Sequence, residues 1–393
     1  MKIITPQNDG WHYFFGYYDL QPFDSKMKYH LCHRVKFMVR LPVESDVCEL
    51  GMIDLETNEF IKLSETTAFN FQQGALLRWF RDDDHIVYNI FDGEAYRTEV
   101  KNIKTGETKR YPMAFADMSL DGKRAVCINF SRIYDFRPGY GYPQIKDKYF
   151  DVNAPADDGV FLMDMDSGEC KLILTYEELK NKLPQKPYSD GKLLVNHITF
   201  NPKGDRFLFL LRNFPAPNEK KWKTMLASSD LEGNVCALTE YCVNSHYHWK
   251  NDKEILIISN VKTDGKVFTL YLIEDETAKA TLLPEPNPTD DIHCIYSPDR
   301  RYIAGDDYPN INNIRTIWLI DTETNRIYRG VSSYSVPTDN TDIRCDLHVR
   351  WSPDGKYLTY DSTHTNSRCV CMVTLEEMLQ TNWSDNWNTP PLK

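Results

Sequence analysis

Four histidines occupy the same position of a short motif that recurs along this sequence. They are His197, His246, His293 and His348, and in three of the copies a proline-containing turn begins four residues later. Imidazole changes its charge near neutral pH, so these side chains can take up or release a proton in catalysis. Neutral imidazoles that converge beside carboxylates can also bind a divalent metal, with Zn or Mn favoured over Ca. The spacing leaves acid–base chemistry and metal binding both open.

Other polar and aromatic side chains fall in segments that we expect near these histidines. Arginine forms two parallel hydrogen bonds with a carboxylate, and aromatic faces stack on sugar rings. A cup of such side chains suits a sugar acid, so the sequence favours an acidic oligosaccharide as the partner. The predicted substrate-binding residues are Tyr17, Tyr88, Arg137, Tyr142, Arg212 and Asp361.

The elements that must position these residues are short strands. The motif occurs in seven copies, three of them weak, and each copy is followed by an apolar run such as residues 207–210 or 255–258. Four short antiparallel strands that recur at roughly 40 to 60 residues are typical of a β-propeller blade. We therefore expect an all-β, seven-bladed β-propeller of four-stranded blades, forming one domain over residues 1–393. The blades are predicted near residues 8–70, 71–112, 113–190, 191–240, 241–286, 287–338 and 339–380, followed by a polar tail at 381–393.

This architecture predicts which residues meet. The first strand of each blade runs along the central channel, so we expect the four histidines to share one end of that channel. A strand at residues 3–4 is expected to complete the last blade, because an open blade would leave an unpaired edge. Only two short segments have a helical pattern, residues 176–180 and 375–379.

Composition restricts the function classes. The chain has 393 residues, and 57 acidic against 46 basic side chains give a formal charge of −11. This balance argues against a nucleic-acid partner, because phosphate binding requires clustered Lys and Arg. No run approaches the roughly 18 apolar residues of a membrane helix, and residues 1–10 lack the apolar segment of a signal peptide. We expect a cytoplasmic protein with no membrane partner, and the sequence gives no signal for an oligomeric partner.

The ten cysteines show no metal-type spacing. We expect them to be reduced and mostly buried. The nearest pair, Cys369 and Cys371, is predicted to point to opposite faces of a strand. No nucleotide-binding glycine motif, serine-hydrolase elbow or HExxH zinc motif occurs in the sequence.

Several motifs resemble a known group of propellers. They are Phe15-Gly-Tyr-Tyr-Asp19, the loop of residues 137–142, residues 305–308 after His293, and residues 346–355 together with Asp361. Over nearly the whole chain the sequence resembles seven-bladed propellers related to oligogalacturonate lyase. It is similar, more distantly, to ulvan lyases and to propeller rhamnosyl-glucuronate hydrolases.

The predicted cofactor is a divalent metal, Mn or Zn, with no other cofactor, and the resemblance to oligogalacturonate lyase implies Mn. That family holds a Mn ion with His and Gln side chains from neighbouring blades, and a further His and an Arg lie near the bond that is cut. By motif position His246 and His293 match metal-bearing blades and His197 matches the additional His. The predicted metal ligands are His246, His293 and His348. The sixth blade departs from the family, because Asp290 and Asp291 stand with His293 where the family has Gln and paired His.

The resemblance to ulvan lyase implies a second set of residues. In that family two His roughly 20 residues apart act with a Tyr and an Arg, and His12 and His33 fit this spacing. The rhamnosyl-glucuronate hydrolases use a single His near the same motif, which again indicates His12. For the Tyr and the Arg no motif chooses among Tyr88, Tyr140, Arg132 and Arg137.

The preferred functional interpretation is a lyase that acts on uronate-containing oligosaccharides by β-elimination. Arg132, Arg137 or a metal would neutralise the uronate carboxylate. His33 or His197 would serve as the base, and His12 or Tyr140 as the acid. The predicted catalytic residues are His12, His33, His197, Arg132 and Tyr140. Two alternatives stay open: a propeller hydrolase that removes rhamnose from rhamnosyl-glucuronate, and a noncatalytic propeller that binds an oligosaccharide or a protein.

Overall fold

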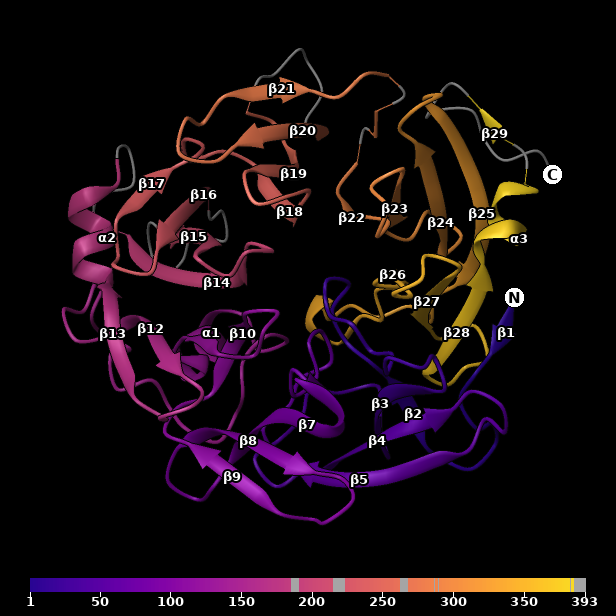
Figure 1. Cartoon of the computed structure of the whole chain (residues 1–393), viewed down its shortest axis with the longest axis horizontal. Helices are drawn as coiled ribbons and strands as arrows, with labels where there is room; N and C mark the ends of the chain where they lie inside the picture. Colours follow the sequence, from indigo (N-terminus) through magenta and orange to yellow (C-terminus); the bar gives the residue numbers. More distant parts are fainter. Residues whose placement is uncertain are drawn as a thin grey trace. The chain divides into compact units, whose positions relative to one another are not determined.

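The chain folds as a seven-bladed β-propeller, as predicted. The structure is a computed structural model that describes residues 1–184, 191–214, 223–261, 268–285, 287–288, 290–381 and 383–384. Seven antiparallel sheets contain its strands, and within each sheet consecutive strands are neighbours (Figure 1). The first three blades are β2 (His12–Phe14), β3 (Tyr29–Val35), β4 (Cys48–Asp54) and β5 (Phe60–Thr66); β6 (Arg78–Phe80), β7 (Asp82–Phe91), β8 (Tyr96–Asn102) and β9 (Thr108–Tyr111); and β10 (Phe115–Met118), β11 (Arg124–Cys127), β12 (Gly159–Asp164) and β13 (Cys170–Thr175).

The other four blades follow the same plan. They are β14 (Lys192–Phe200), β15 (Arg206–Phe214), β16 (Lys223–Asp230) and β17 (Val235–Ala237); β18 (Asn244–Trp249), β19 (Glu254–Ser259), β20 (Thr269–Glu274) and β21 (Ala280–Leu282); β22 (Ile292–Tyr296), β23 (Tyr302–Asp307), β24 (Ile314–Asp321), β25 (Arg326–Tyr334) and an added β29 (Trp383–Ser384); and β26 (Arg350–Trp351), β27 (Tyr357–Ser362) and β28 (Cys369–Thr374) with β1 (Lys2–Ile3). The blade boundaries given above stay predictions.

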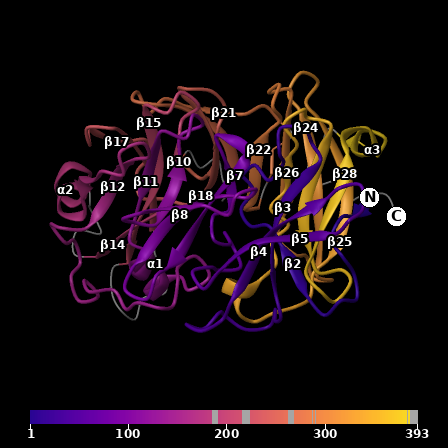
Figure 2. The ribbon, with the colours of Figure 1, turned by 60° about the horizontal axis from the view of Figure 1, so that its bottom comes forward.

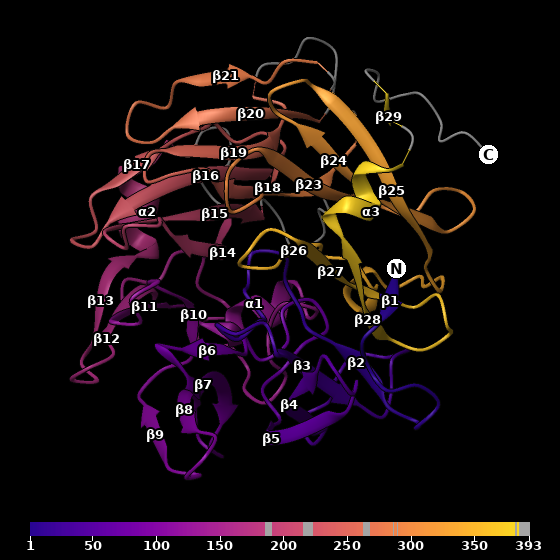
Figure 3. The ribbon, with the colours of Figure 1, turned by 45° about the vertical axis from the view of Figure 1, so that its right-hand side comes forward.

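A terminal strand completes the last blade, which confirms that part of the prediction. Strand β1 pairs antiparallel with β28, with Ile3 opposite Cys371 (Figure 3). Of the predicted tail 381–393, residue 382 and residues 385–393 lie outside the described residues, whereas β29 pairs with β25.

Two compact units divide the chain. The first unit consists of Met1–Ile90, Val100–Lys109 and Leu283–Lys393, and the second of Phe91–Glu99 and Arg110–Leu282. All of the first, sixth and seventh blades belong to the first unit, and all of the third, fourth and fifth to the second.

The repeated turn motif forms the hairpin between the first two strands of a blade. In the seventh blade the hydroxyl of Ser352 donates to Asp354 at 2.7 Å and accepts the backbone N–H of Tyr357 at 2.9 Å. The sixth blade repeats this turn with Ser297 and Tyr302. Gly355 has a φ of 70°, a conformation that glycine adopts without strain. The motif therefore places the preceding histidine at a fixed distance from a rigid turn.

Short helices cap or follow strands. The predicted helices are confirmed as α2 (Tyr176–Lys182) and α3 (Leu375–Leu379), and each begins with a reciprocal capping box. In the first unit α3 packs against β25 and β28 (Figure 2). The sequence analysis expected helices only at 176–180 and 375–379 and missed α1 (Phe130–Phe136), although Asn129 caps its first turn by accepting from Ser131 N at 3.0 Å. A 3₁₀ turn spans Thr341–Ile343.

The cysteine prediction needs one correction. Cys369 and Cys371 were expected on opposite faces of a strand, but their sulfur atoms lie 3.9 Å apart. Residues two apart in a strand point to the same face, so the expectation was wrong. No disulfide links the cysteines among the described residues, and both of these are fully buried. No helix among the described residues is long and apolar enough to span a membrane.

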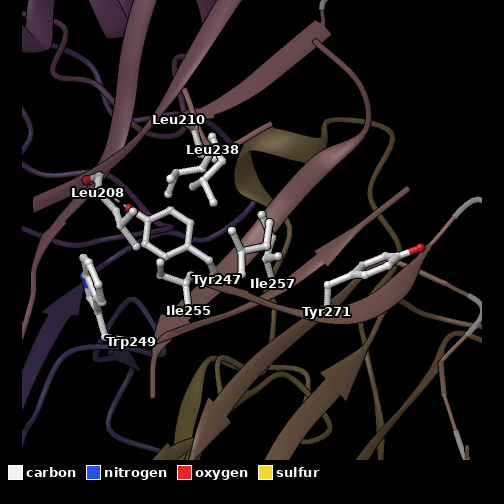
Figure 4. Close-up of a cluster of buried hydrophobic side chains, with 10 residues drawn as sticks. Leu208, Leu210, Leu238, Tyr247, Trp249, Ile255, Ile257 and Tyr271 are labelled. Atoms are coloured by element: carbon white, nitrogen blue, oxygen red, sulfur yellow. Dashed lines mark hydrogen bonds between the residues drawn. The ribbon is translucent and has the colours of Figure 1, made fainter. Parts of the chain in front are cut away.

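The second unit packs its blades through apolar side chains. Tyr247 on β18 lies against Leu208 and Leu210 of β15, with Ile255 and Ile257 of β19 in the same cluster (Figure 4). The tyrosine hydroxyl donates to the carbonyl of His197, so its one polar group has an acceptor. We call this group the Tyr247 cluster. It shows that two blades can pack together almost entirely through apolar side chains.

Candidate functional site

Two of the predicted histidines meet in the first unit. The rings of His293 on β22 and His348, which precedes β26, lie 4.5 Å apart at 76°. Tyr17 meets His348 edge-to-face at 4.9 Å, and Tyr18 lies 5.3 Å from His293. All four side chains are at most 3% exposed. We call these four residues the histidine cluster.

A buried ion pair positions the two tyrosines. Arg350 donates to Asp361 at 2.8 Å and to the carbonyl of Gly16 at 2.9 Å. The same carboxylate accepts the backbone N–H groups of Phe15 and Gly16 at 3.2 and 3.3 Å. Gly16 has a φ of 127°, and a Cβ there would lie 2.9 Å from the carbonyl carbon of Gln73, so the segment requires glycine. Asp361, a predicted substrate-binding residue, is 2% exposed and serves this clamp.

One carboxylate orients the two histidines. Asp306 on β23 contacts Nδ1 of His293 at 3.0 Å, and its other oxygen accepts the backbone N–H of Val349, next to His348, at 3.1 Å. Burial lowers the pKa of His293, but the charge and the hydrogen bond of Asp306, together with the charges of Asp346 and Asp291, outweigh it and raise the pKa above 6.5. Asp306 therefore favours the protonated form of His293.

A second carboxylate lies between two arginines. Asp346 pairs with Arg315 at 2.9 Å and accepts two hydrogen bonds from Arg344 at 2.7 and 2.9 Å. Burial opposes ionisation, yet the two guanidinium groups hold the pKa of Asp346 well below its usual range. The Arg344 guanidinium lies 4.4 Å from the ring of Tyr308, and its side chain is 21% exposed. Arg344 thus connects the buried charges to solvent.

The cluster contains atoms that fit a divalent metal. One ligand atom from each of His293, Asp346 and His348 lies within 4.8 Å of the others. Asp306 binds the Nδ1 side of His293, which is the arrangement that commonly orients a metal-ligating imidazole. The donor set of two nitrogens and one oxygen suits Mn or Zn. Asp346 completes this group, and His246 stays a predicted ligand in the second unit.

The first-blade histidines differ in environment. His33 is fully buried, its Nε2 accepts the backbone N–H of Ala75 at 3.0 Å, and burial lowers its pKa to about 3. This favours a structural role over that of a base. His12 is partly exposed and its Nδ1 lies 2.8 Å from the hydroxyl of Ser367. Burial and the charge of Arg368 lower the pKa of His12, so this imidazole is neutral near pH 7.

The candidate residues of the 130–142 segment lie in the second unit. Arg132 on α1 is fully buried, pairs with Asp147 at 3.2 Å and donates to four backbone carbonyls. These bonds favour a structural role for Arg132. The Arg137 guanidinium lies 4.2 Å from the ring of Tyr140, and Tyr142 stacks on Phe130 at 4.5 Å.

Four other candidates have contacts within their own blades or with a neighbouring blade. His197 has a φ of 45° and its ring stacks on Tyr247 at 4.2 Å. His246 lies beside the hydroxyl of Ser245 at 3.2 Å. Arg212 donates to Asn196 at 2.6 Å. Tyr88, in the first unit, shares a hydrogen bond of 2.7 Å with Ser64.

The sequence analysis did not single out Arg315 and Arg344, which hold Asp346. Arg315 interrupts the apolar strand β24 and is fully buried. A charged residue within such a strand was the available signal, because buried arginines require a partner. Asp306 and Asp346 lay in the motifs on which the resemblance was based, without an assigned role.

Comparison with known proteins supports the fold. No protein-family model matches the chain, and no curated protein matches it. The structure is similar to an oligogalacturonate lyase from Vibrio parahaemolyticus, with a TM-score of 0.67, 13% identity and coverage of 95% of this chain and 92% of that one. It is also similar to an oligogalacturonate lyase in complex with manganese, with a TM-score of 0.66, 14% identity and the same coverage.

A third similar structure is the β-propeller domain of the trilobed protease from Pyrococcus furiosus, with a TM-score of 0.51, 11% identity and coverage of 96% of this chain and 100% of that domain. Identities this low establish the shared propeller fold and leave the reaction to be argued from the residues. The more distant similarity to ulvan lyases and rhamnosyl-glucuronate hydrolases stays a prediction.

Proposed function

We propose that the protein is a carbohydrate-active enzyme that cleaves acidic oligosaccharides by β-elimination at the histidine cluster. The observation that carries this proposal is the pair of imidazoles, His293 and His348, with two tyrosines and an Asp–Arg network. The similarity to oligogalacturonate lyases supports a uronate-containing substrate.

The reaction makes three demands on a site. Positive charge must offset the uronate carboxylate, so that the C5 proton becomes acidic. A base then removes this proton, the C4–C5 double bond forms and the C4–O bond breaks. An acid protonates the leaving oxygen. The site therefore needs one cationic group and two groups that transfer protons.

The histidine cluster offers a residue for each demand. His293, whose protonated form is favoured by Asp306, and the partly exposed Arg344 are the proposed sources of positive charge. His348 is the proposed base. Tyr17, whose ring lies 4.9 Å from that of His348, is the proposed acid, since its phenol O–H can donate a proton. His293 and His348 are 1% and 2% exposed, so neighbouring side chains must move aside before a sugar reaches them.

A divalent metal is an alternative source of the positive charge. His293, His348 and Asp346 are the residues that would hold it. Bound there, Mn or Zn would act as a Lewis acid toward the substrate carboxylate. In this alternative His348 would be a ligand, so the role of base would pass to another side chain of the protein.

The test combines metal analysis with a substrate screen. Purified protein is analysed for bound metal and then incubated with saturated and unsaturated uronate oligosaccharides, with Mn, with Zn or with a chelator. We expect ultraviolet absorbance from the new C4–C5 double bond, and its loss in His348→Ala. A matched control is His85→Asn, which removes a partly exposed imidazole paired with Asp82 at 2.8 Å.

Other outcomes separate the alternatives. New reducing ends without absorbance would indicate the hydrolase, and binding without any product would indicate a noncatalytic propeller. Loss of folding rather than of turnover in His348→Ala, seen by circular dichroism, would place the imidazole among the structural residues and contradict the proposal.

A further inference from the structure

Arg368, which precedes β28 in the first unit, lines a cavity of about 180 Å³. The residue is 2% exposed, and its guanidinium lies 4.2 Å from the ring of Phe71. One nitrogen, Nη2, donates to the carbonyl of Ile343, whereas Nε finds no acceptor among the described residues. No described carboxylate forms an ion pair with it.

Three of the other buried arginines in this chain are neutralised. Arg132, Arg315 and Arg350 are each at most 1% exposed, and each pairs with a buried aspartate. The partners are Asp147 at 3.2 Å, Asp346 at 2.9 Å and Asp361 at 2.8 Å. Arg368 is as buried as these three and faces a cavity where they face a carboxylate.

Burying a cation without a counter-charge costs free energy, even after the protein relaxes around it. The cation–π contact with Phe71 and the single carbonyl offset part of this cost. A ligand that brings a negative charge would offset the rest. We propose that this cavity binds a small organic carboxylate, whose charge neutralises Arg368.

The cavity walls define the rest of the ligand. Met38, Val336 and Pro337 form one apolar side, and the hydroxyl of Thr363, which accepts from Val336 N, can donate to an oxygen beside the carboxylate. A cavity of roughly 150 Å³ accepts a molecule the size of benzene. The ligand is therefore a single small acid with a ring or a short chain, since 180 Å³ leaves no room for an oligosaccharide.

This carboxylate cavity shares a wall with the histidine cluster's charge network. Ile343 and Cys345 line the cavity, whereas Arg344 and Asp346, which alternate with them along the chain, form the ion pair beside His293. The inference does not depend on the proposed lyase activity, because it stands on the charge of Arg368 alone. Occupancy of the cavity would fix the segment that carries Arg344.

Thermal unfolding tests the proposal. The probes are sodium benzoate and sodium galacturonate, with benzamide and galactose as their uncharged counterparts and sodium chloride at matched ionic strength. We expect at least one of the two carboxylates to raise Tm in a saturable way, and the uncharged molecules and chloride to leave it unchanged. A ligand at 100 times its Kd stabilises a protein by about 2.7 kcal/mol, which gives a measurable shift.

Two variants locate the effect. In Arg368→Met the carboxylate-dependent shift should disappear, while Tm without ligand stays equal or rises because an unneutralised charge has been removed. Val39→Phe, at a 73% exposed position on the cavity wall, should block binding without disturbing the core. Lys36→Met is the control for a nearby exposed cation and should retain the full shift.

Three results would overturn the inference. They are equal shifts from charged and uncharged probes, a shift that persists in Arg368→Met, and the absence of any shift together with a lower Tm for Arg368→Met. The last result would show that the guanidinium serves packing. None of these measurements uses oligosaccharide cleavage, so failure here is distinguishable from failure of the proposed function.

Discussion

The Tyr247 cluster packs with apolar side chains, whereas the histidine cluster packs with charged and polar ones. Both surround a histidine at the same position of the repeat, with nearly the same backbone: φ is 45° at His197 and 47° at His348. In the second unit His197 stacks on Tyr247 among leucine and isoleucine side chains. In the first unit His348 lies beside His293, which a carboxylate holds.

The difference shows that the fold does not need the charges. Apolar side chains are sufficient to pack the Tyr247 cluster, as its buried residues demonstrate. Burying Asp306, Asp346 and Arg315 in the first unit costs solvation that leucine or isoleucine would not. These three charged side chains are buried beside two imidazoles despite the cost in solvation. Proton transfer requires such a charged environment around the titrating groups. The contrast therefore favours function for the histidine cluster.

Removing an imidazole from the histidine cluster should give the largest effect. We expect His348→Ala and His293→Ala to lower turnover of a uronate oligosaccharide by roughly 10² to 10⁴-fold, the usual contribution of a proton-transferring side chain. The fold should persist in His348→Ala, because alanine leaves no buried charge unpaired at that position. Initial rates and circular dichroism on the same samples check both statements. Unfolding with unchanged residual turnover would mean that the two clusters do not differ in function.

Breaking the charge network should give the next largest effect, now on stability. Asp346→Asn leaves the fully buried Arg315 without its carboxylate, and removing one partner of such a pair costs about 3 to 5 kcal/mol. Denaturant unfolding measures the free energy of unfolding. Replacing both partners, as Asp346→Leu with Arg315→Met, should recover most of the loss. Equal losses in the single and double variants would show that volume, and not charge, matters there.

The Tyr247 cluster should respond to a loss of volume instead. Ile257→Ala removes buried methyl groups and should lower the free energy of unfolding by about 2 to 5 kcal/mol, with the same loss across the neutral pH range. Turnover should stay near the wild-type value under conditions where the variant is folded. A loss that varied strongly between pH 6 and 8 (roughly the range in which histidine titrates) would contradict the purely apolar description.

The repeat explains why the fold could be predicted and the charges could not. The turn residues, such as Ser352 and Gly355, act locally, so their pattern specifies strand order and the place of His348 in its blade. The partners of His293 come from other strands and loops and share no spacing rule with it. Asp306 follows thirteen positions later, and Asp346 lies in the next blade's entry loop.

Helix α1 was not predicted, for a related reason. Its only local signal was the cap at Asn129, while the burial of Arg132 depends on Asp147, fifteen residues away. From the sequence, Arg132 was therefore predicted to be available to a substrate. In the structure, backbone carbonyl groups surround its guanidinium instead. Charged residues within a repeat are predictable in position but not in partner, because the partner is a property of the packing.

The smallest expected effect is a pH dependence confined to the histidine cluster. Asp306 raises the pKa of His293 above 6.5, so folding favours the protonated imidazole. This stability is fully present below pH 6.5 and is lost as pH rises through the higher pKa of the folded protein. The stability difference between wild type and His293→Gln should therefore shrink from pH 6 toward alkaline pH (roughly 6 to 9).

Asp307 must be separated from this effect, because burial raises its pKa to about 7 and its titration has the same sign. Stability that depends on protonated Asp307 also falls as pH rises through about 7. Measuring His293→Gln in an Asp307→Asn background removes that contribution and leaves the imidazole alone. If the pH dependence then vanishes, Asp307 is its source and the raised pKa of His293 is wrong. If it persists, the proton that distinguishes the two clusters lies on His293.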